Sequence, residues 1–339
     1  MSYIRYVNTA SVGGDGTTNN TTGSTAAYVS IVDCISGEET SLSDDLIIEL
    51  CGSADDSGGA DFALFTSANW TMNGFTITAR GNDSLSSGAH DGVWDDNAYT
   101  ISVSISGVGY GLRNEGVSGL NLERFQIENT NAGAESSYVV RLTDGAETNI
   151  NGLIVRNHTN GQGIHIEDSG SNTNIRNSIV YSINMGAESE GISSDVSFNG
   201  TINIDNTVTY NFDDGMERDN AQTTNVQNSI SFGSTAQDWD ALSSVTYSAS
   251  DDSQAGTGNI QPANWDAEFT DYTNFDFTIL DTDAEIYGAG TDLSGEFTTD
   301  ITGATRSVWS MGPFDAPGGG EPPTSGNPWF YYLQQQLAA

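Results

Sequence analysis

The chain has 339 residues, with 46 Asp and Glu against 9 Lys and Arg, so its formal net charge is −37. All nine basic residues are arginine, which excludes a Schiff-base lysine and a P-loop lysine. Without clustered positive charge, the chain has no footprint for nucleic acid or for an anionic membrane surface. The 39 glycines, the 6 prolines and the 36% hydrophobic content argue against a helical bundle.

The N-terminal residues carry no targeting signal. The opening MSYIRYVNTA has no basic segment followed by an apolar one. No apolar run in the chain reaches the roughly 18 residues that a membrane span requires. We therefore expect a protein that is made in the cytoplasm without a signal peptide and that does not enter a membrane.

The first 70 residues predict an N-terminal cap together with the first coils of a repetitive fold. Residues 3–7 are strand-like, residues 26–36 are compatible with a helix, and residues 46–50 predict the first buried strand. A helix over an open sheet end would protect its unpaired backbone groups. The two cysteines, Cys34 and Cys51, are better interpreted as buried thiols than as a disulfide.

Internal repetition is the strongest signal in the chain. Five stretches share an Asn, an aliphatic residue, a short polar break and a second apolar pair: residues 121–129, 149–157, 174–182, 203–211 and 225–233. Their aliphatic anchors are spaced 28, 25, 29 and 22 residues apart: Leu122, Ile150, Ile175, Ile204 and Val226. This variable period predicts the coils of a parallel β-helix with the anchors stacked inward. A β-sandwich is the alternative, but nothing in that fold requires the Asn-aliphatic sequence pattern to recur five times.

A second element recurs between these stretches. It begins with Gly and ends with Asp in residues 163–168, 191–195 and 215–219, and residues 138–144 fill the same place one repeat earlier. The terminal acids could form a column that binds Ca²⁺ through oxygen ligands: Asp144, Asp168, Asp195 and Asp219. The favoured interpretation is that each Asp stabilises a turn, so we predict no resident cofactor.

The densest acidic segment is a candidate for glycoside hydrolysis, which uses paired carboxylates. Asp213, Asp214 and Glu217 are its candidate catalytic residues, one coil after Glu188 and Glu190. Asp195 and Glu167 would lie on neighbouring coils. Against catalysis, 46 acids on an elongated surface form pairs by chance, and the aromatic residues expected in a sugar groove occupy slots predicted to face inward: Tyr181, Tyr210 and Phe232.

Other catalytic constellations are weaker. A lyase mechanism needs carboxylates that bind Ca²⁺ and a basic proton acceptor, for which Arg156 and Arg176 are candidates. Each is better explained as a salt partner, of Glu128 and Asp205 respectively. The three histidines, His90, His158 and His165, are not spaced as metal ligands. His165 lies between two inward isoleucines, so we expect it to point to solvent.

The C-terminal residues predict an attachment element. Residues 317–326 have the composition of a Gly/Pro linker, and residues 327–339 follow as an aromatic peptide. Its candidate partner-binding residues are Trp329, Phe330, Tyr331, Tyr332 and Leu333. The alternative is that this peptide folds back over the open C-terminal coil.

The two ends of the chain resemble a known superfamily. Residues 5–8, 13–18 and 26–31 resemble the N-terminal cap of right-handed parallel β-helix proteins of the pectin-lyase-like superfamily, and are similar to the versions that tailed bacteriophages encode. Residues 300–315 resemble the closing phrase of such helices, with Ser-Met-Gly-Pro at 310–313 replacing the usual ending. The resemblance implies an all-β, right-handed parallel β-helix with its body at residues 71–316.

These features together predict a bacteriophage virion structural protein without enzymatic activity, either a capsid decoration protein or a head or tail fibre component. The resemblance implies a homotrimer, located in the virion and attached to other virion proteins through the C-terminal arm. One alternative is a tailspike-like depolymerase that cleaves host surface polysaccharide. The other is an adhesin that binds glycans without cleaving them.

Overall fold

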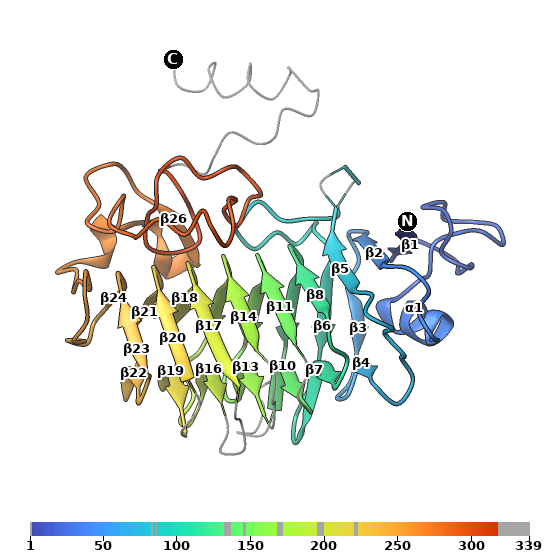
Figure 1. Cartoon of the computed structure of the whole chain (residues 1–339), viewed down its shortest axis with the longest axis horizontal. Helices are drawn as coiled ribbons and strands as arrows, with labels where there is room; N and C mark the ends of the chain where they lie inside the picture. The colour runs from blue at the N-terminus through green and yellow to red at the C-terminus, as the bar shows by residue number, and fades with distance from the viewer. Residues whose placement is uncertain are drawn as a thin grey trace, which may run out of the picture.

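The computed structural model describes residues 2–82, 84–85, 87–131, 137–144, 147–167, 172–194, 200–219 and 223–317. It is a right-handed parallel β-helix, as predicted (Figure 1). Each complete coil contributes one strand to each of three parallel sheets, which we number in chain order. The predicted aromatic docking peptide, and the linker after Pro317, lie outside the described residues.

In the described part of the chain, sheet one has nine strands, sheet two has eight and sheet three has seven. Sheet one contains β1 (Tyr3–Asn8), β2 (Leu46–Cys51), β5 (Ile77–Gly81), β8 (Leu120–Glu123), β11 (Thr148–Asn151), β14 (Thr173–Arg176), β17 (Thr201–Asp205), β20 (Thr223–Gln227) and β23 (Ser244–Thr246). Sheet two contains β3 (Asp56–Gly58), β6 (Thr100–Val103), β9 (Gln126–Asn129), β12 (Ile154–Asn157), β15 (Ile179–Ser182), β18 (Val208–Tyr210), β21 (Ile230–Phe232) and β24 (Ala249–Ser250). Sheet three contains β4 (Ala63–Thr66), β7 (Gly109–Glu115), β10 (Ser137–Thr143), β13 (Gln162–Ile166), β16 (Glu190–Ser194), β19 (Asp214–Arg218) and β22 (Gln237–Asp240).

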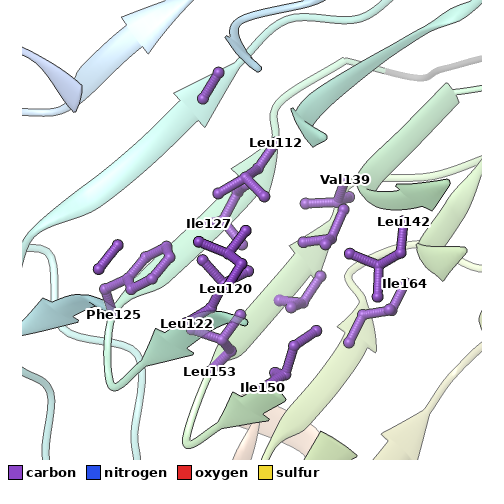
Figure 2. Packing of buried hydrophobic residues seen from close by; sticks show 14 of the residues in the cluster. Leu112, Leu120, Leu122, Phe125, Ile127, Val139, Leu142, Ile150, Leu153 and Ile164 are labelled. Carbon is purple, nitrogen blue, oxygen red and sulfur yellow. The ribbon is translucent and has the colours of Figure 1, made fainter. Parts of the chain in front are cut away.

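The predicted aliphatic anchors form one inward column in sheet one. The strand register aligns Leu122 with Ile150, Ile150 with Ile175, and so on to Val226. All five side chains are at most 1% exposed. Figure 2 shows Leu122 and Ile150 facing Leu112 and Ile127 from the other two sheets. The prediction of a stacked aliphatic core is confirmed.

The Asn that opens each repeat forms a ladder on the outer face of sheet one. Each side-chain amide donates to the side-chain oxygen of the preceding coil, from Asn149 to Asn121 (3.0 Å), Asn174 to Asn149 (2.8 Å), Asn203 to Asn174 (3.0 Å) and Asn225 to Asn203 (3.1 Å). Asn suits this role because its amide is both a donor and an acceptor. The repeated phrase thus encodes the inner and outer columns of the same sheet.

The chain turns from sheet one to sheet two three residues after each ladder Asn. At three of these corners the residue is again Asn: Asn177, Asn206 and Asn228, with φ of 48°, 50° and 51°. Asn tolerates this left-handed conformation better than most residues, because its short polar side chain bonds locally. The side chain of Asn206 donates to the carbonyls of Ser310 and Gly312, each at 2.8 Å. The corner is therefore also a docking line for the C-terminal segment.

The helix α1 (Ile31–Glu38) covers the first coil. It buries Ile31, Cys34 and Ile35 against the core, and both Cys34 and Cys51 are buried free thiols. The helix begins later than the predicted 26–36, because Ser30 caps it by accepting from the Asp33 amide and Tyr28 pairs with Val7 instead. No helix within the described ranges is long and apolar enough to cross a membrane.

Residues 251–317 leave the coil path and pack on the outer face of sheet two (Figure 1, orange to red). This segment includes β25 (Phe269–Asp271), β26 (Asp276–Ile279) and two short 3₁₀ turns, Trp265–Ala267 and Tyr272–Asn274. It covers the aromatic side chains of sheet two: the Tyr181 ring stacks on Phe275 at 4.5 Å, and Phe232 stacks on Trp265 at 4.2 Å.

The expectation that Tyr181, Tyr210 and Phe232 face inward is wrong. Val180 lies in the helix core, so Tyr181 beside it points outward, and Tyr210 and Phe232 follow in the same register. The C-terminal segment covers these rings and shields them from water. They form a second apolar cluster outside the coils and do not line a sugar groove.

Arg306 fastens this segment to the corner. Its guanidinium is only 8% exposed and donates to Asn177 Oδ1 (2.7 Å), to the Pro313 carbonyl (2.9 Å) and to the Thr299 carbonyl (3.2 Å). Burial lowers the pKa of Arg306 to about 10, against the raising effect of nearby Asp300 and Asp315. The closing phrase identified in the sequence is thus a buried, multiply bonded anchor.

We predict that Arg306→Met loosens residues 251–317 while the coils stay folded. The variant leaves Asn177 Oδ1 and the two carbonyls without their donor, at a cost of about 1–3 kcal/mol for each buried group. Limited proteolysis should show new cleavage between residues 251 and 317. Arg306→Lys, which keeps the charge but not the planar fork, should give an intermediate rate. Wild-type resistance of the Met variant would contradict this role.

Candidate functional site

The outer face of sheet three carries two parallel columns of polar and aromatic side chains. The first column holds Tyr110, Tyr138 and Gln162, then Glu190, Asp214 and Gln237 on the following coils. The second holds Arg113, Arg141, His165, Ser193, Glu217 and Asp240. The columns change along the helix axis from arginine and tyrosine at one end to carboxylates at the other.

An open pocket of about 370 Å³ lies at the acidic end of these columns. The side chains that line it come from four successive coils: Tyr138, Gln162, Glu188, Glu190, Asp213, Asp214 and Glu217. The structure therefore brings the predicted Asp213, Asp214 and Glu217 into one site. Glu167 lies apart from it, because its carboxylate accepts from Arg141 Nε at 2.8 Å. Asp195 lies outside the described residues.

Glu190 and Glu217 line the pocket as a carboxyl pair that comes from the neighbouring strands β16 and β19. Burial, followed by the charge of Glu190 and the hydrogen bond between them, raises the pKa of Glu217 to about 9. Burial also raises the pKa of Glu190, while hydrogen bonds from Ser193 and Glu217 oppose that rise. Two carboxyl groups this close resist ionising together, so the pair holds one proton near neutral pH.

The two aspartates next to the pair have different roles. Asp213 accepts hydrogen bonds from the Glu188 amide (2.9 Å) and from the Thr235 hydroxyl, so it holds together two loops at the rim. Asp214 is the register partner of Glu190 in the neighbouring strand. Burial raises its pKa, and the charges of Asp213 and Asp240 raise it further. Asp214 thus places a third carboxyl group beside the pair in the same pocket.

His165 leaves sheet three on its outer face, but the expectation that it points to solvent is wrong. Its side chain is only 6% exposed because the ring of Tyr138 stacks on it with centroids 4.6 Å apart. Its Nδ1 lies 3.0 Å from the Ser193 hydroxyl oxygen, which is itself 2.8 Å from Gln162 Oε1. The histidine is therefore part of a polar network that leads to the acidic pair.

The arginines of this face, and the arginines weighed for a lyase mechanism, are all engaged by acids. Arg141 pairs with Glu167, and Arg113 Nη2 lies 3.0 Å from Glu115. Arg156 bonds Glu128 at 2.6 Å and Arg176 bonds Asp205 at 3.4 Å, which confirms their predicted salt partners. Arg156 and Arg176 lie on sheets two and one, away from the pocket on sheet three.

The weak calcium candidates divide between described and undescribed residues. Asp144 has a left-handed φ of 63° at the end of β10, as a turn residue does. Asp219 follows β19 and is exposed, whereas Asp168 and Asp195 lie outside the described residues. Within the described ranges, no group of three or more His, Cys, Asp or Glu side chains has the arrangement of a metal site.

Sequence reasoning missed Glu190 as the partner of Glu217, and it missed Gln162 and Ser193 altogether. The signal was available in the recurring glycine element. Aligning Gly163, Gly191 and Gly215 places the residue before each glycine in one column and the residue two after it in another. Those columns hold the functional side chains: Gln162, Glu190 and Asp214 in the first, and His165, Ser193 and Glu217 in the second.

Comparisons with known proteins find a structural likeness but no sequence match. No family model matches the sequence. No curated protein matches it either. Among solved structures, the chain is similar to the crystal structure of pectate lyase Pel9A, with a TM-score of 0.44 and 12% sequence identity, over 93% of this chain and 96% of that one.

The prediction that the protein is not an enzyme is corrected here, because a solved structure to which the chain is similar is that of an enzyme, a pectate lyase. The β-helix fold itself serves enzymes and non-enzymes alike. The likeness therefore concerns the fold, and the case for chemistry depends on the pocket. There, a half-buried carboxyl pair holds a proton that an ordinary glutamic acid would have released.

We predict that Glu217→Gln becomes more stable relative to the wild type as the pH rises. The folded-state pKa of Glu217 is raised from an ordinary value of 4.5 to about 9, so folded protein binds more protons than unfolded protein between those values. Wild-type stability contributed by this group therefore falls as the pH increases from about 5 to 9.

Denaturant unfolding at pH 5 and pH 8 measures the difference between the two proteins. The free energy of unfolding of the variant, relative to that of the wild type, should be higher at pH 8 than at pH 5, because Gln has no charge to bury. Glu285→Gln, a substitution at an exposed acid of the C-terminal segment, is the matched control and should show no such change. An equal difference at both pH values would contradict the proton-holding pair.

Proposed function

We propose that the protein hydrolyses glycosidic bonds of a polysaccharide at the pocket on sheet three. The observation that carries this proposal is the cluster of Glu190, Asp214 and Glu217 in one pocket, where burial and the charge of Glu190 raise the pKa of Glu217. Glycosidases need one carboxyl group that donates a proton to the departing oxygen and a second, ionised one that acts as base or nucleophile. A raised pKa is what suits a carboxyl group to the acid role.

The roles follow from the contacts. Glu217 donates its proton to the glycosidic oxygen as the bond to the sugar carbon breaks. Glu190 is too close to Glu217 for the opposite role, since acid and nucleophile are about 5–5.5 Å apart in retaining enzymes and farther apart in inverting ones. Asp214 supplies that second carboxylate, which either attacks the sugar carbon or takes a proton from the attacking water. Glu190 then assists Glu217 by favouring its protonated form.

The charge of the pocket favours an uncharged polysaccharide as substrate. Of the seven described residues that line it, five are acids and none is arginine. A polyuronate would meet like charge there, which costs binding energy without a compensating cation. Tyr138 supplies a partly exposed aromatic edge at the pocket wall, a residue type that packs against sugar rings.

This proposal takes up the depolymerase alternative from the sequence. The virion location, the homotrimer and attachment through Trp329 to Leu333 are added to it as proposals from sequence resemblance and composition alone. They are separable from the chemistry, because a purified chain can be assayed without them.

The experiment incubates the purified protein with a panel of neutral polysaccharides and polyuronates and measures reducing ends. Hydrolysis should release reducing ends from a neutral member without forming the ultraviolet-absorbing unsaturated sugar that a lyase produces. Glu217→Gln and Asp214→Asn should each reduce the rate by about 10²-fold or more. Glu285→Gln, remote from the pocket, should retain the wild-type rate.

Three outcomes would contradict the proposal. Unsaturated products would indicate elimination in place of hydrolysis. A rate unaffected by Glu217→Gln would place the chemistry elsewhere. Binding without cleavage across the panel would favour the adhesin.

A further inference from the structure

Gln162 is the one amide side chain among the seven described residues that line the pocket on sheet three. Five of the others are acids, whose ionised carboxylates only accept hydrogen bonds, and the sixth is Tyr138. An amide differs from a carboxylate because its carbonyl oxygen accepts while its NH₂ group donates. The kind of ligand that the pocket binds therefore depends on which end of the Gln162 amide faces it.

A chain of hydrogen bonds fixes the carbonyl end of this amide. The Ser193 hydroxyl group donates to Gln162 Oε1 at 2.8 Å. Because a serine hydroxyl has a single proton, the 3.0 Å contact between His165 Nδ1 and the Ser193 oxygen is a donation from the histidine. Gln162 Nε2 makes no hydrogen bond to the residues that the structure describes. The amide therefore turns its carbonyl to Ser193 and leaves its NH₂ group for a ligand.

Burial holds the two residues behind Gln162 in place. Ser193 is 3% exposed and His165 is 6% exposed, and strand register sets them opposite each other on β13 and β16. The Tyr138 ring stacks on the imidazole with centroids 4.6 Å apart and planes at 24°. The NH₂ donor is thus built into the sheet, and it is not a freely rotating surface group.

The carboxylates that follow Gln162 in the same outer column are acceptors. Glu190 lies on the next coil and Asp214 on the one after it, with successive positions about 4.8 Å apart. This row of side chains offers a fixed donor at Gln162 and acceptors beside it. A ligand group that fits the row must accept a hydrogen bond at one end and donate one at the other.

Among the common substituents of sugars, the acetamido group of an N-acetylated amino sugar meets this requirement. Its carbonyl oxygen accepts, its N–H donates, and the two point in opposite directions from a planar trans amide. A uronate carboxylate has no donor, and the ammonium group of a free amino sugar has no acceptor. A hydroxyl group must use one rotating oxygen for both contacts. The acetamido group is also uncharged, so it avoids the repulsion that a uronate meets.

We propose that Gln162 is a specificity-determining residue that selects a polysaccharide of N-acetylated amino sugars. Its NH₂ group donates to the acetamido carbonyl oxygen, and the acetamido N–H donates to the neighbouring carboxylates of Glu190 and Asp214. Ser193 and His165 are positioning residues, because they act through the Gln162 carbonyl. This inference rests on the proposed function, since it names the substrate class of the same pocket.

The test measures the binding of methyl glycosides to the full chain by nuclear magnetic resonance. Glycosides of N-acetylglucosamine and N-acetylgalactosamine are compared with those of glucose, galactose and glucosamine, which carry a hydroxyl or an ammonium group at the same carbon. The acetamido glycosides should bind about tenfold more tightly, the worth of one well-placed hydrogen bond. With nitrogen-15 in the glutamine side chains, the NH₂ signals that disappear in Gln162→Leu should shift on binding, and those of Gln237 should not.

Variants locate the source of the preference. Gln162→Leu and the nearly isosteric Gln162→Glu both remove the NH₂ group and should abolish the preference for acetamido glycosides. Ser193→Ala, which frees the amide to turn, should reduce it, and Ser193→Thr should restore it. Gln237→Leu is the matched control and should retain the preference, because Gln237 lies farther along the same column and is not among the described residues that line the pocket.

The outcomes keep this inference apart from the proposed function. Equal affinity for the acetamido and hydroxyl glycosides, or a preference that survives in both Gln162 variants, overturns the inference. Hydrolysis of a polysaccharide without acetamido groups, in a reaction that depends on Glu217, does the same while supporting the hydrolase. Preferential acetamido binding without cleavage of any polysaccharide supports the inference and counts against the hydrolase.

Discussion

Parallel pairing of each coil with the one before it is the constraint on which the rest of the structure depends. It places like positions of successive coils about 4.8 Å apart, so a side chain that suits one coil must tolerate a copy of itself above and below. Aliphatic residues do so by packing, which gives the column from Leu122 to Val226. Asparagines do so by donating to one neighbour and accepting from the other, which gives the ladder from Asn121 to Asn225. Carboxyl groups on neighbouring coils oppose one another's ionisation, as the charge of Glu190 does for Glu217 across the two outer columns of sheet three.

The same constraint explains how much of the fold the sequence predicted. The core column and the salt partners of Arg156 and Arg176 follow from coil-to-coil register, and an aligned repeat reveals register directly. The inward placement of Tyr181, Tyr210 and Phe232 failed because apolar character was equated with the core. A distant segment, residues 251–317, covers these rings, and nothing in the local alternation shows which later segment will do so.

The site was predicted in part for a similar reason. Asp213, Asp214 and Glu217 stand out because they are adjacent along the chain. Glu190 lies 27 residues before Glu217, and only the alignment of coils brings the two together. His165 was assigned correctly to the outer face but wrongly to solvent, since its cover comes from Tyr138 on the preceding coil. Side-chain stacking between coils is a property of the assembled helix, and alternation within a single strand does not reveal it.

The corner asparagines and the repeated columns have a consequence for how such a protein can change over evolutionary time. Insertion or deletion of single residues within a strand would turn core residues outward, whereas gain or loss of a complete coil preserves every column. A coil added before β13 would lengthen the tyrosine and arginine end of the sheet three face by one strand spacing and leave the contact between β16 and β19 intact. The length of the sheet three face and the composition of its acidic pocket can therefore change independently, and the coil is the unit in which the length varies.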